Sequence, residues 1–209
     1  NMILKNIKDN VLYSVRSSAV NEDSKNASFA GMMSSYLNIG KDSILTFIKK
    51  TYLSAFSKKA VEYRKTNKLT SINIKMAVIV QEMIDADYSG VLFTINPVTN
   101  NPDEFVISAT KGLGEALVSG EVNSVDYYVN AGNVKGDDPL LSKEQIHNVV
   151  KLGYQILSNS KHFQDIEFAI KENKIYLLQT RPIVPYRNID ITEPRTTYDN
   201  ANIVESYSG

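Results

Sequence analysis

Two short apolar runs near the carboxy-terminal end of the sequence constrain its fold most, because only a few residues separate them. Residues 166–170 (IEFAI) and 175–179 (IYLLQ) flank the pair Glu172–Asn173. Two strand-like runs around such a turn predict an antiparallel hairpin. If the turn sets the pairing, Glu167 and Gln179 lie nearly opposite each other on one face of that hairpin.

The side chains on this hairpin suggest a site for a cation and a polyphosphate. Glu167 and Gln179 offer a carboxylate and an amide oxygen, which suit a hard divalent cation. Arg181 follows on the second strand, and a guanidinium suits phosphoryl oxygens in a way that lysine does not match. This trio predicts nucleotide binding for phosphoryl transfer, with magnesium at Glu167 and Gln179.

A second stretch, VRSSAVNEDSKNASFAG, has a related chemical rationale. Its small residues, with Gly31 near the end, let backbone amides approach an anion closely. Ser35 adds a hydroxyl, and Arg16 stands at the end of the strand expected over 11–16, where it can contact a phosphate. On spacing alone, a solvated loop in which Gly31 only permits a turn explains the stretch about equally well.

Two further motifs are ambiguous when taken singly. Gln81, Glu82 and Met83 end a buried apolar run, where backbone groups could meet an adenine edge, although an ordinary strand exit explains them as well. In GLGEALVSGE, Gly112 and Gly114 could serve only a tight strand-to-helix turn.

The whole pattern predicts an α+β fold with a mixed, largely antiparallel sheet and helices packed on one side, because short turns rather than regular crossover helices join the strands. The expected strands are residues 11–16, 76–83, 90–95, 105–109, 127–130, 166–170 and 175–179, with a loop over 17–33 and helices over 41–65 and 142–157. Ser142 and the next three residues have the pattern of a capping box at the start of the second helix.

Composition removes several classes of function. There is no cysteine, which excludes disulfides, thiolate catalysis and cysteine-bound zinc. The 23 basic and 23 acidic side chains give a formal net charge of zero, so nothing favours a nucleic acid or an anionic membrane as partner. No apolar run approaches the roughly 20 residues that span a bilayer, and the cytoplasm is the expected location.

The motifs in their order resemble the ATP-binding domain of the phosphoenolpyruvate synthase and pyruvate phosphate dikinase family, which includes rifampin phosphotransferases. They are VRSSAVNEDSKNASFAG, YLNIG, AVEYRK, MAVIVQEMI, SGVLFTINPVT, GLGEALVSGEV and DIEFAI…IYLLQTRP, and they cover about residues 11–182. The resemblance implies an ATP-grasp domain that splits ATP to AMP. It also implies that the β-phosphate passes to a histidine on a separate swivelling domain, that the γ-phosphate goes to water, and that an acceptor such as pyruvate is phosphorylated last.

Roles for individual residues follow from the same resemblance. Arg16 and Arg181 match the two arginines that contact phosphates and act in catalysis. Gly31 and Ser35 match the glycine-rich loop over the phosphates, although many members have threonine at the second position. Glu167 and Gln179 match ligands of magnesium and nucleotide. The adenine pocket is matched by Gln81, with Glu82 and Met83 beside it.

The sequence also departs from the family pattern. A Gly-Gly-Lys segment, whose lysine reaches the phosphates, and the Thr-x-Ser-His motif of the swivelling domain are not in this sequence, and Val125 replaces a proline before Asp126. His147 and His162 lack the surroundings of a phosphocarrier. We therefore expect an incomplete nucleotide-binding domain over 1–184, a linker or next domain over 185–209, and little or no ATP cleavage by this chain alone.

Two other functions stay open. The acceptor in a rifampin-phosphotransferase-like enzyme would be an antibiotic hydroxyl. Alternatively, the chain is a non-catalytic nucleotide-binding module. The missing lysine segment argues for this alternative, and the retained Glu167, Gln179 and two arginines argue against it.

Overall fold

A computed structural model describes residues 3–19, 23–24, 27–28, 34–66, 75–114, 124–136 and 138–183. The chain forms two compact units, Asn1–Met83 and Ile84–Gly209. We describe each unit by itself. Gly31, the greater part of GLGEALVSGE and the expected linker over 185–209 lie outside the described residues.

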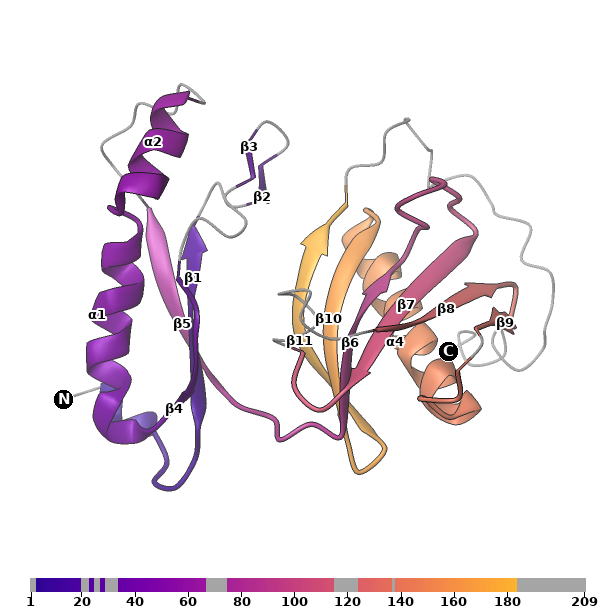
Figure 1. The fold of residues 1–209 in the computed structure, drawn as a ribbon, viewed down its shortest axis with the longest axis horizontal. Helices are drawn as coiled ribbons and strands as arrows, with labels where there is room; N and C mark the ends of the chain where they lie inside the picture. Colours follow the sequence, from indigo (N-terminus) through magenta and orange to yellow (C-terminus); the bar gives the residue numbers. More distant parts are fainter. Residues whose placement is uncertain are drawn as a thin grey trace. The chain divides into compact units, whose positions relative to one another are not determined.

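The first unit is a three-stranded antiparallel sheet with a helix on one face (Figure 1). Its strand order is β4 (Tyr36–Ile39), β1 (Tyr13–Ala19), β5 (Met76–Glu82). Helix α1 (Ile44–Ser54) covers the face that carries Val15 and Val80, and these side chains share one apolar cluster with Ile44 and Phe47. The remaining elements of this unit are η1 (Ile3–Asn6), η2 (Lys41–Ser43), α2 (Lys58–Thr66) and the short strands β2 (Asp23–Ser24) and β3 (Ala27–Ser28).

Two sequence predictions for this unit are corrected. The single helix expected over 41–65 is interrupted between α1 and α2. The amide of Ser57 donates to the carbonyl of Ser54, while the hydroxyl of Ser57 accepts from the amide of Ala60. The first bond closes a tight backbone turn after α1, and the second lets the side chain of Ser57 cap the start of α2. Strand β1 also continues to Ala19, where a loop was expected from residue 17, because β5 pairs with it up to that residue.

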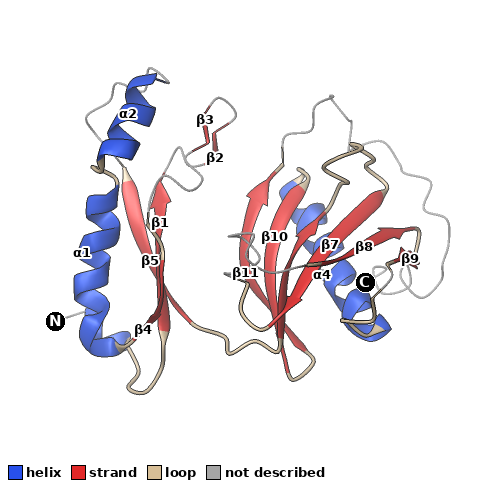
Figure 2. Cartoon of the chain, in the orientation of Figure 1, coloured by secondary structure: helices blue, strands red, loops and turns tan. Residues whose placement is uncertain are grey.

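The second unit is a six-stranded sheet in the order β11–β10–β6–β7–β8–β9, with helix α4 against one face (Figure 2). The elements are β6 (Tyr88–Phe93), β7 (Glu104–Lys111), β8 (Val125–Asn130), β9 (Asn133–Lys135), α4 (Lys143–Ser160), β10 (Gln164–Lys171) and β11 (Lys174–Pro182). Every strand pairing that the structure describes is antiparallel, so the α+β prediction is confirmed and no parallel pairing occurs in these ranges.

Helix α4 is fixed by its start and by one close approach to the sheet. The predicted capping box is confirmed, since the hydroxyl of Ser142 accepts from the amide of Gln145 and the Gln145 side chain accepts from the amide of Ser142. A Cβ added at Gly153 would lie 2.6 Å from a methyl of Leu92 and 3.0 Å from the ring of Phe105. Glycine therefore lets this helix lie close to the sheet. No described helix is long and apolar enough to cross a membrane.

Candidate functional site

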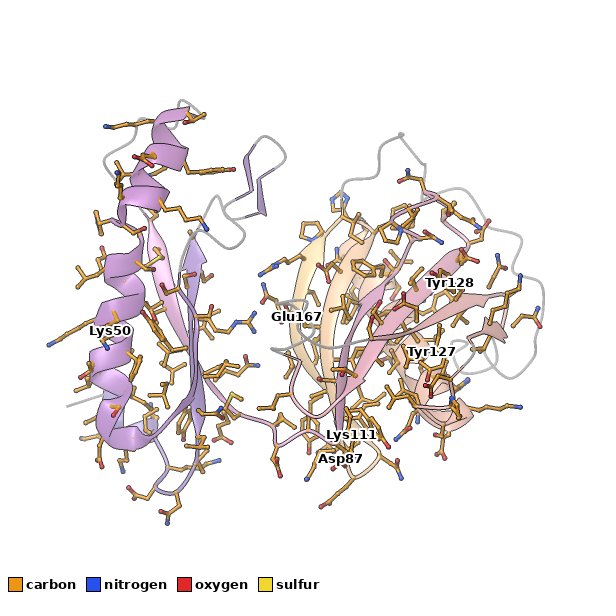
Figure 3. The ribbon with its side chains drawn as sticks, in the orientation of Figure 1. Lys50, Asp87, Lys111, Tyr127, Tyr128 and Glu167 are labelled. Atoms are coloured by element: carbon orange, nitrogen blue, oxygen red, sulfur yellow. The ribbon has the colours of Figure 1, made fainter. Side chains whose placement is uncertain are left out.

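The hairpin predicted from the sequence is present and has the expected pairing. Glu167 on β10 pairs directly with Gln179 on β11, and Asp165 pairs directly with Arg181. The turn residues Glu172 and Asn173 have φ angles of 50° and 61°. These left-handed angles are those of the two-residue turn that matches the twist of a hairpin. Figure 3 marks Glu167 on β10, away from the turn end of the hairpin.

All four of these side chains lie on the face of the sheet that α4 does not cover. The alternate residues of β10, namely Ile166, Phe168 and Ile170, are fully buried in the cluster that includes α4. Successive side chains of a strand point to opposite faces, so Asp165 and Glu167 lie on the other face.

A β-bulge lies directly beside the central pair. Glu167 pairs with Gln179, but Phe168 pairs with Leu177, so Leu178 is the extra residue on β11. Bulges bend a strand and re-aim the side chains next to them. Without the bulge, Leu178 would lie opposite Glu167 and Gln179 opposite the buried Ile166, so the bulge brings Gln179 to the face that carries Glu167.

The register extends this face into rows that cross the whole sheet. One row runs through Gln179, Glu167, Val91, Ser108 and Asp126 on five neighbouring strands. The next row begins with Arg181 and Asp165 and continues through Phe93, Val106 and Tyr128. Polar side chains therefore occupy both ends of each row, and apolar ones form its middle.

The far end of the first row is ordered by its own hydrogen bond. The hydroxyl of Ser108 donates to the carboxylate of Asp126 over 2.6 Å. Strands lie about 4.8 Å apart, so three strand spacings put Asp126 roughly 14 Å from Glu167. Asp126 thus cannot share a cation with Glu167, although both lie on one face.

The sequence reasoning missed Asp165. The signal was its position two residues before Glu167, which in a strand means the same face and the neighbouring row. Its direct partner across the hairpin, Arg181, is half-buried like Asp165 itself.

The pair Glu167 and Gln179 fits a divalent cation. The Oε1 atom of Gln179 is buried and has no hydrogen-bond partner among the described residues. A buried acceptor without a donor is costly and calls for an explanation such as an ion. Carboxylate and amide oxygens are ligands of hard cations. No group of three or more His, Cys, Asp or Glu side chains within the described ranges could hold a metal ion, so the amide would be an essential ligand here.

In the first unit, two predicted residues share the face opposite α1. Arg16 on β1 pairs with Ile79 on β5, and Ser14 pairs with Gln81. Arg16 and Gln81 are thus diagonal neighbours on one face, at a separation of about 7–8 Å. Tyr36 pairs with Val15, so Ser35, which is exposed, lies just beyond this pairing and beside Arg16.

The side chain of Glu82 does not lie on that face, and the amide of Met83 is already hydrogen-bonded to a backbone carbonyl. Glu82 pairs with Tyr13, on the α1 side of the sheet, and its carboxylate lies 2.6 Å from the ammonium of Lys8. This hydrogen bond raises the pKa of Lys8. The amide of Met83 donates to the carbonyl of Leu12 over 2.8 Å. An adenine edge would have to use other backbone groups of these residues.

Gly112 lies in a tight turn after a strand, which is the structural role considered for it from the sequence. It follows β7 with a φ angle of 78°, its amide donates to the carbonyl of Asp87, and its carbonyl accepts from the hydroxyl of Ser89 over 2.6 Å. Figure 3 shows Asp87 and Lys111 together at this end of the sheet. Gly112 therefore makes a turn that only glycine adopts without strain.

Comparison with known proteins identifies a family and several relatives. The family model described as "Pyruvate phosphate dikinase, AMP/ATP-binding domain" matches residues 1–138 and 133–201. A probable phosphoenolpyruvate synthase of Methanocaldococcus jannaschii is 34% identical over 84% of this chain and 17% of its own length. The corresponding protein of Methanothermobacter thermautotrophicus is 35% identical over 84% of this chain and 30% of its own length.

A second group of relatives has a different name. A rifampicin phosphotransferase of Bacillus cereus is 36% identical over 86% of this chain and 24% of its own length. The chain thus spans less than a third of the curated relatives it matches. The family match covers nearly the whole sequence, and the chain belongs to the pyruvate phosphate dikinase AMP/ATP-binding domain family.

Proposed function

We propose that this chain is the ATP-binding portion of a dikinase-type phosphotransferase that splits ATP to AMP. The observation that carries the proposal is the direct pairing of Glu167 with Gln179, whose buried Oε1 atom has no hydrogen-bond partner among the described residues. A bound magnesium ion would supply that partner and would neutralise charge on the phosphoryl oxygens.

The residues matched to the nucleotide have complementary tasks within each unit. Arg181 would bind phosphoryl oxygens and stabilise the charge that develops during transfer. Asp165, its direct partner, would orient the guanidinium. Arg16 would contribute the second guanidinium, with Ser35 and Gly31 covering the phosphates. Gln81, with the backbone of Glu82 and Met83, would contact the adenine.

The remaining steps concern the whole protein. The β-phosphate would pass to a histidine on a separate swivelling domain, the γ-phosphate would go to water, and the phosphohistidine would phosphorylate the final acceptor. We also propose a cytoplasmic location, a nucleotide-binding domain that ends near residue 184, and a linker or next domain after it. The proposals for the whole protein rest on the family and on the fraction of the relatives that this chain covers. The domain end near residue 184 rests on the last described strand, which ends at Pro182, although the family match extends to residue 201.

Pyruvate is the first candidate acceptor, because the synthases are among the relatives. A rifampicin-type antibiotic is the second, since that group of relatives is 36% identical, as similar as the synthases are. A non-catalytic nucleotide-binding module is the remaining alternative.

The product formed from ATP tests the proposal. The native protein is incubated with magnesium and ATP, with pyruvate or rifampicin as acceptor, and nucleotides are separated by chromatography. AMP that appears only with one acceptor supports the dikinase function and identifies the acceptor. ADP in place of AMP contradicts it, and tight ATP binding without any cleavage indicates the non-catalytic module.

A further inference from the structure

We infer that Ile79 forms the apolar surface on which the nucleoside part of the ATP rests. This inference rests on the proposed function and assigns a residue that neither the sequence motifs nor the family match singles out. Ile79 lies in the middle of β5, and 46% of its surface is exposed although it is a large apolar residue.

The register puts Ile79 among the nucleotide-binding residues of the first unit. Its direct partner across the sheet is Arg16, and directly opposite residues have Cβ atoms about 4.5–5.5 Å apart. Gln81 is two residues further on the same strand and therefore on the same face. Ile79 thus lies beside the proposed phosphate ligand and the proposed adenine ligand at once.

The other residues of this face are polar or small. On β1 they are Ser14, Arg16 and Ser18, and on β5 they are Ala77 and Gln81. The opposite face holds Val78 and Val80 in the cluster with α1. Alternation along a strand with one solvated face predicts a polar residue at position 79. The isoleucine breaks this pattern between the two residues assigned to the nucleotide.

A nucleotide matches this surface in both charge and polarity. The base and ribose offer an apolar face next to the anionic phosphates, as Ile79 lies next to the cationic Arg16. Ile79 would act by contact with base and ribose alone, so it should not affect a ligand that consists only of phosphates.

The test compares the dissociation constants of ATP and inorganic tripolyphosphate, both with magnesium, in the native protein. Ile79→Ala should raise the dissociation constant of ATP about tenfold, because roughly two buried methylene groups are lost. The dissociation constant of tripolyphosphate should stay unchanged. Ile79→Val should retain most of the ATP affinity. Leu53→Ala is the matched control, because Leu53 is 64% exposed on α1 in the same unit, and it should change neither constant.

The outcomes separate this inference from the function on which it rests. If the unaltered protein binds ATP and Ile79→Ala binds it equally well, the inference is wrong and the proposed function stands. An equal loss for ATP and tripolyphosphate, or a lower melting temperature of the unliganded protein, would mean that Ile79 is structural. If the unaltered protein binds no ATP, both proposals fail.

Discussion

Glu167 and Gln179 face each other directly across the β10–β11 hairpin, and the pairing slips by one residue immediately beside them. The acid and the amide are thus fixed by backbone hydrogen bonds on two adjacent strands rather than by a loop. Sites built on strands hold their ligands more precisely than sites on loops. This arrangement leaves Leu178 as an extra residue on β11.

Replacing Gln179 by leucine should separate stability from function. The change removes a buried acceptor that has no partner among the described residues, so the free energy of unfolding should stay unchanged or rise by up to about 1 kcal/mol. Magnesium-dependent ATP binding should weaken at the same time. Urea unfolding and ATP titration of the same variant measure both quantities.

Gln145→Leu is the matched control, because this buried glutamine is fully engaged. Its side chain accepts from the amide of Ser142 and donates to the side chain of Asn173. The variant should lose about 1–3 kcal/mol of stability, since it leaves partners unsatisfied. Equal stability losses for the leucine variants of Gln179 and Gln145 would contradict our assignment of an unpartnered oxygen.

Gly153→Ala should destabilise the second unit although alanine favours a helix. The added methyl group would lie 2.6 Å from a methyl group of Leu92 and 3.0 Å from the ring of Phe105, so these buried side chains or the helix must shift. Overpacking of about 1–3 kcal/mol outweighs the gain of about 1 kcal/mol in helix propensity. Gly40→Ala is the control, since no atom lies within 4 Å of its added Cβ and its φ angle of −76° suits alanine. Thermal unfolding that ranks the two variants in the reverse order would refute the close approach of α4.

Asp87 should make stability depend on pH at the acid end. Its carboxylate accepts from the amide of Glu172 over 2.7 Å, and this hydrogen bond, helped by Lys171, holds its pKa below the ordinary value of 3.8. A carboxyl with a lowered pKa in the folded state stabilises the fold above its unfolded pKa. That contribution is lost as the pH falls through the folded pKa.

The expected result is therefore a stability gap between the unaltered protein and Asp87→Asn that is constant near pH 7 and narrows below about pH 3.8. Urea midpoints from pH 7 to pH 2 measure it, with Asp103→Asn, an exposed carboxylate outside the hairpin, as control. A gap that does not change with pH would show that the hydrogen bond of Asp87 contributes nothing.

The hairpin and its turn were predictable because their information is local: strand alternation and a two-residue turn indicate an antiparallel pair. The turn alone would put Leu178 opposite Glu167, so the direct pairing of Glu167 with Gln179 depends on the bulge at Leu178, which the sequence pattern does not predict. The capping box at Ser142 was predictable for the same reason. The antiparallel character followed from the short connections.

What the sequence did not predict depends on contacts between distant segments. The extension of β1 to Ala19 requires its partner β5, some 60 residues away in the chain, and the short edge strand β4 exists only by pairing with β1. The row that joins Glu167 to Asp126 depends on three strand pairings at once. The break between α1 and α2 depends on a tight backbone turn after Ser54 and on the hydroxyl of Ser57, which caps α2 in competition with a continuing helix.

The most direct test of our central claim is the effect of magnesium on ATP affinity in Glu167→Gln. The dissociation constant of ATP is measured with and without magnesium in the native protein, in this variant and in Glu172→Gln, a control at an exposed glutamate in the turn of the same hairpin. We predict that magnesium strengthens ATP binding in the unaltered protein and in the control. Glu167→Gln should keep the melting temperature of the unaltered protein. The factor by which magnesium strengthens ATP binding should fall at least about tenfold in this variant. An undiminished magnesium effect in Glu167→Gln would contradict the cation site and the account built on it.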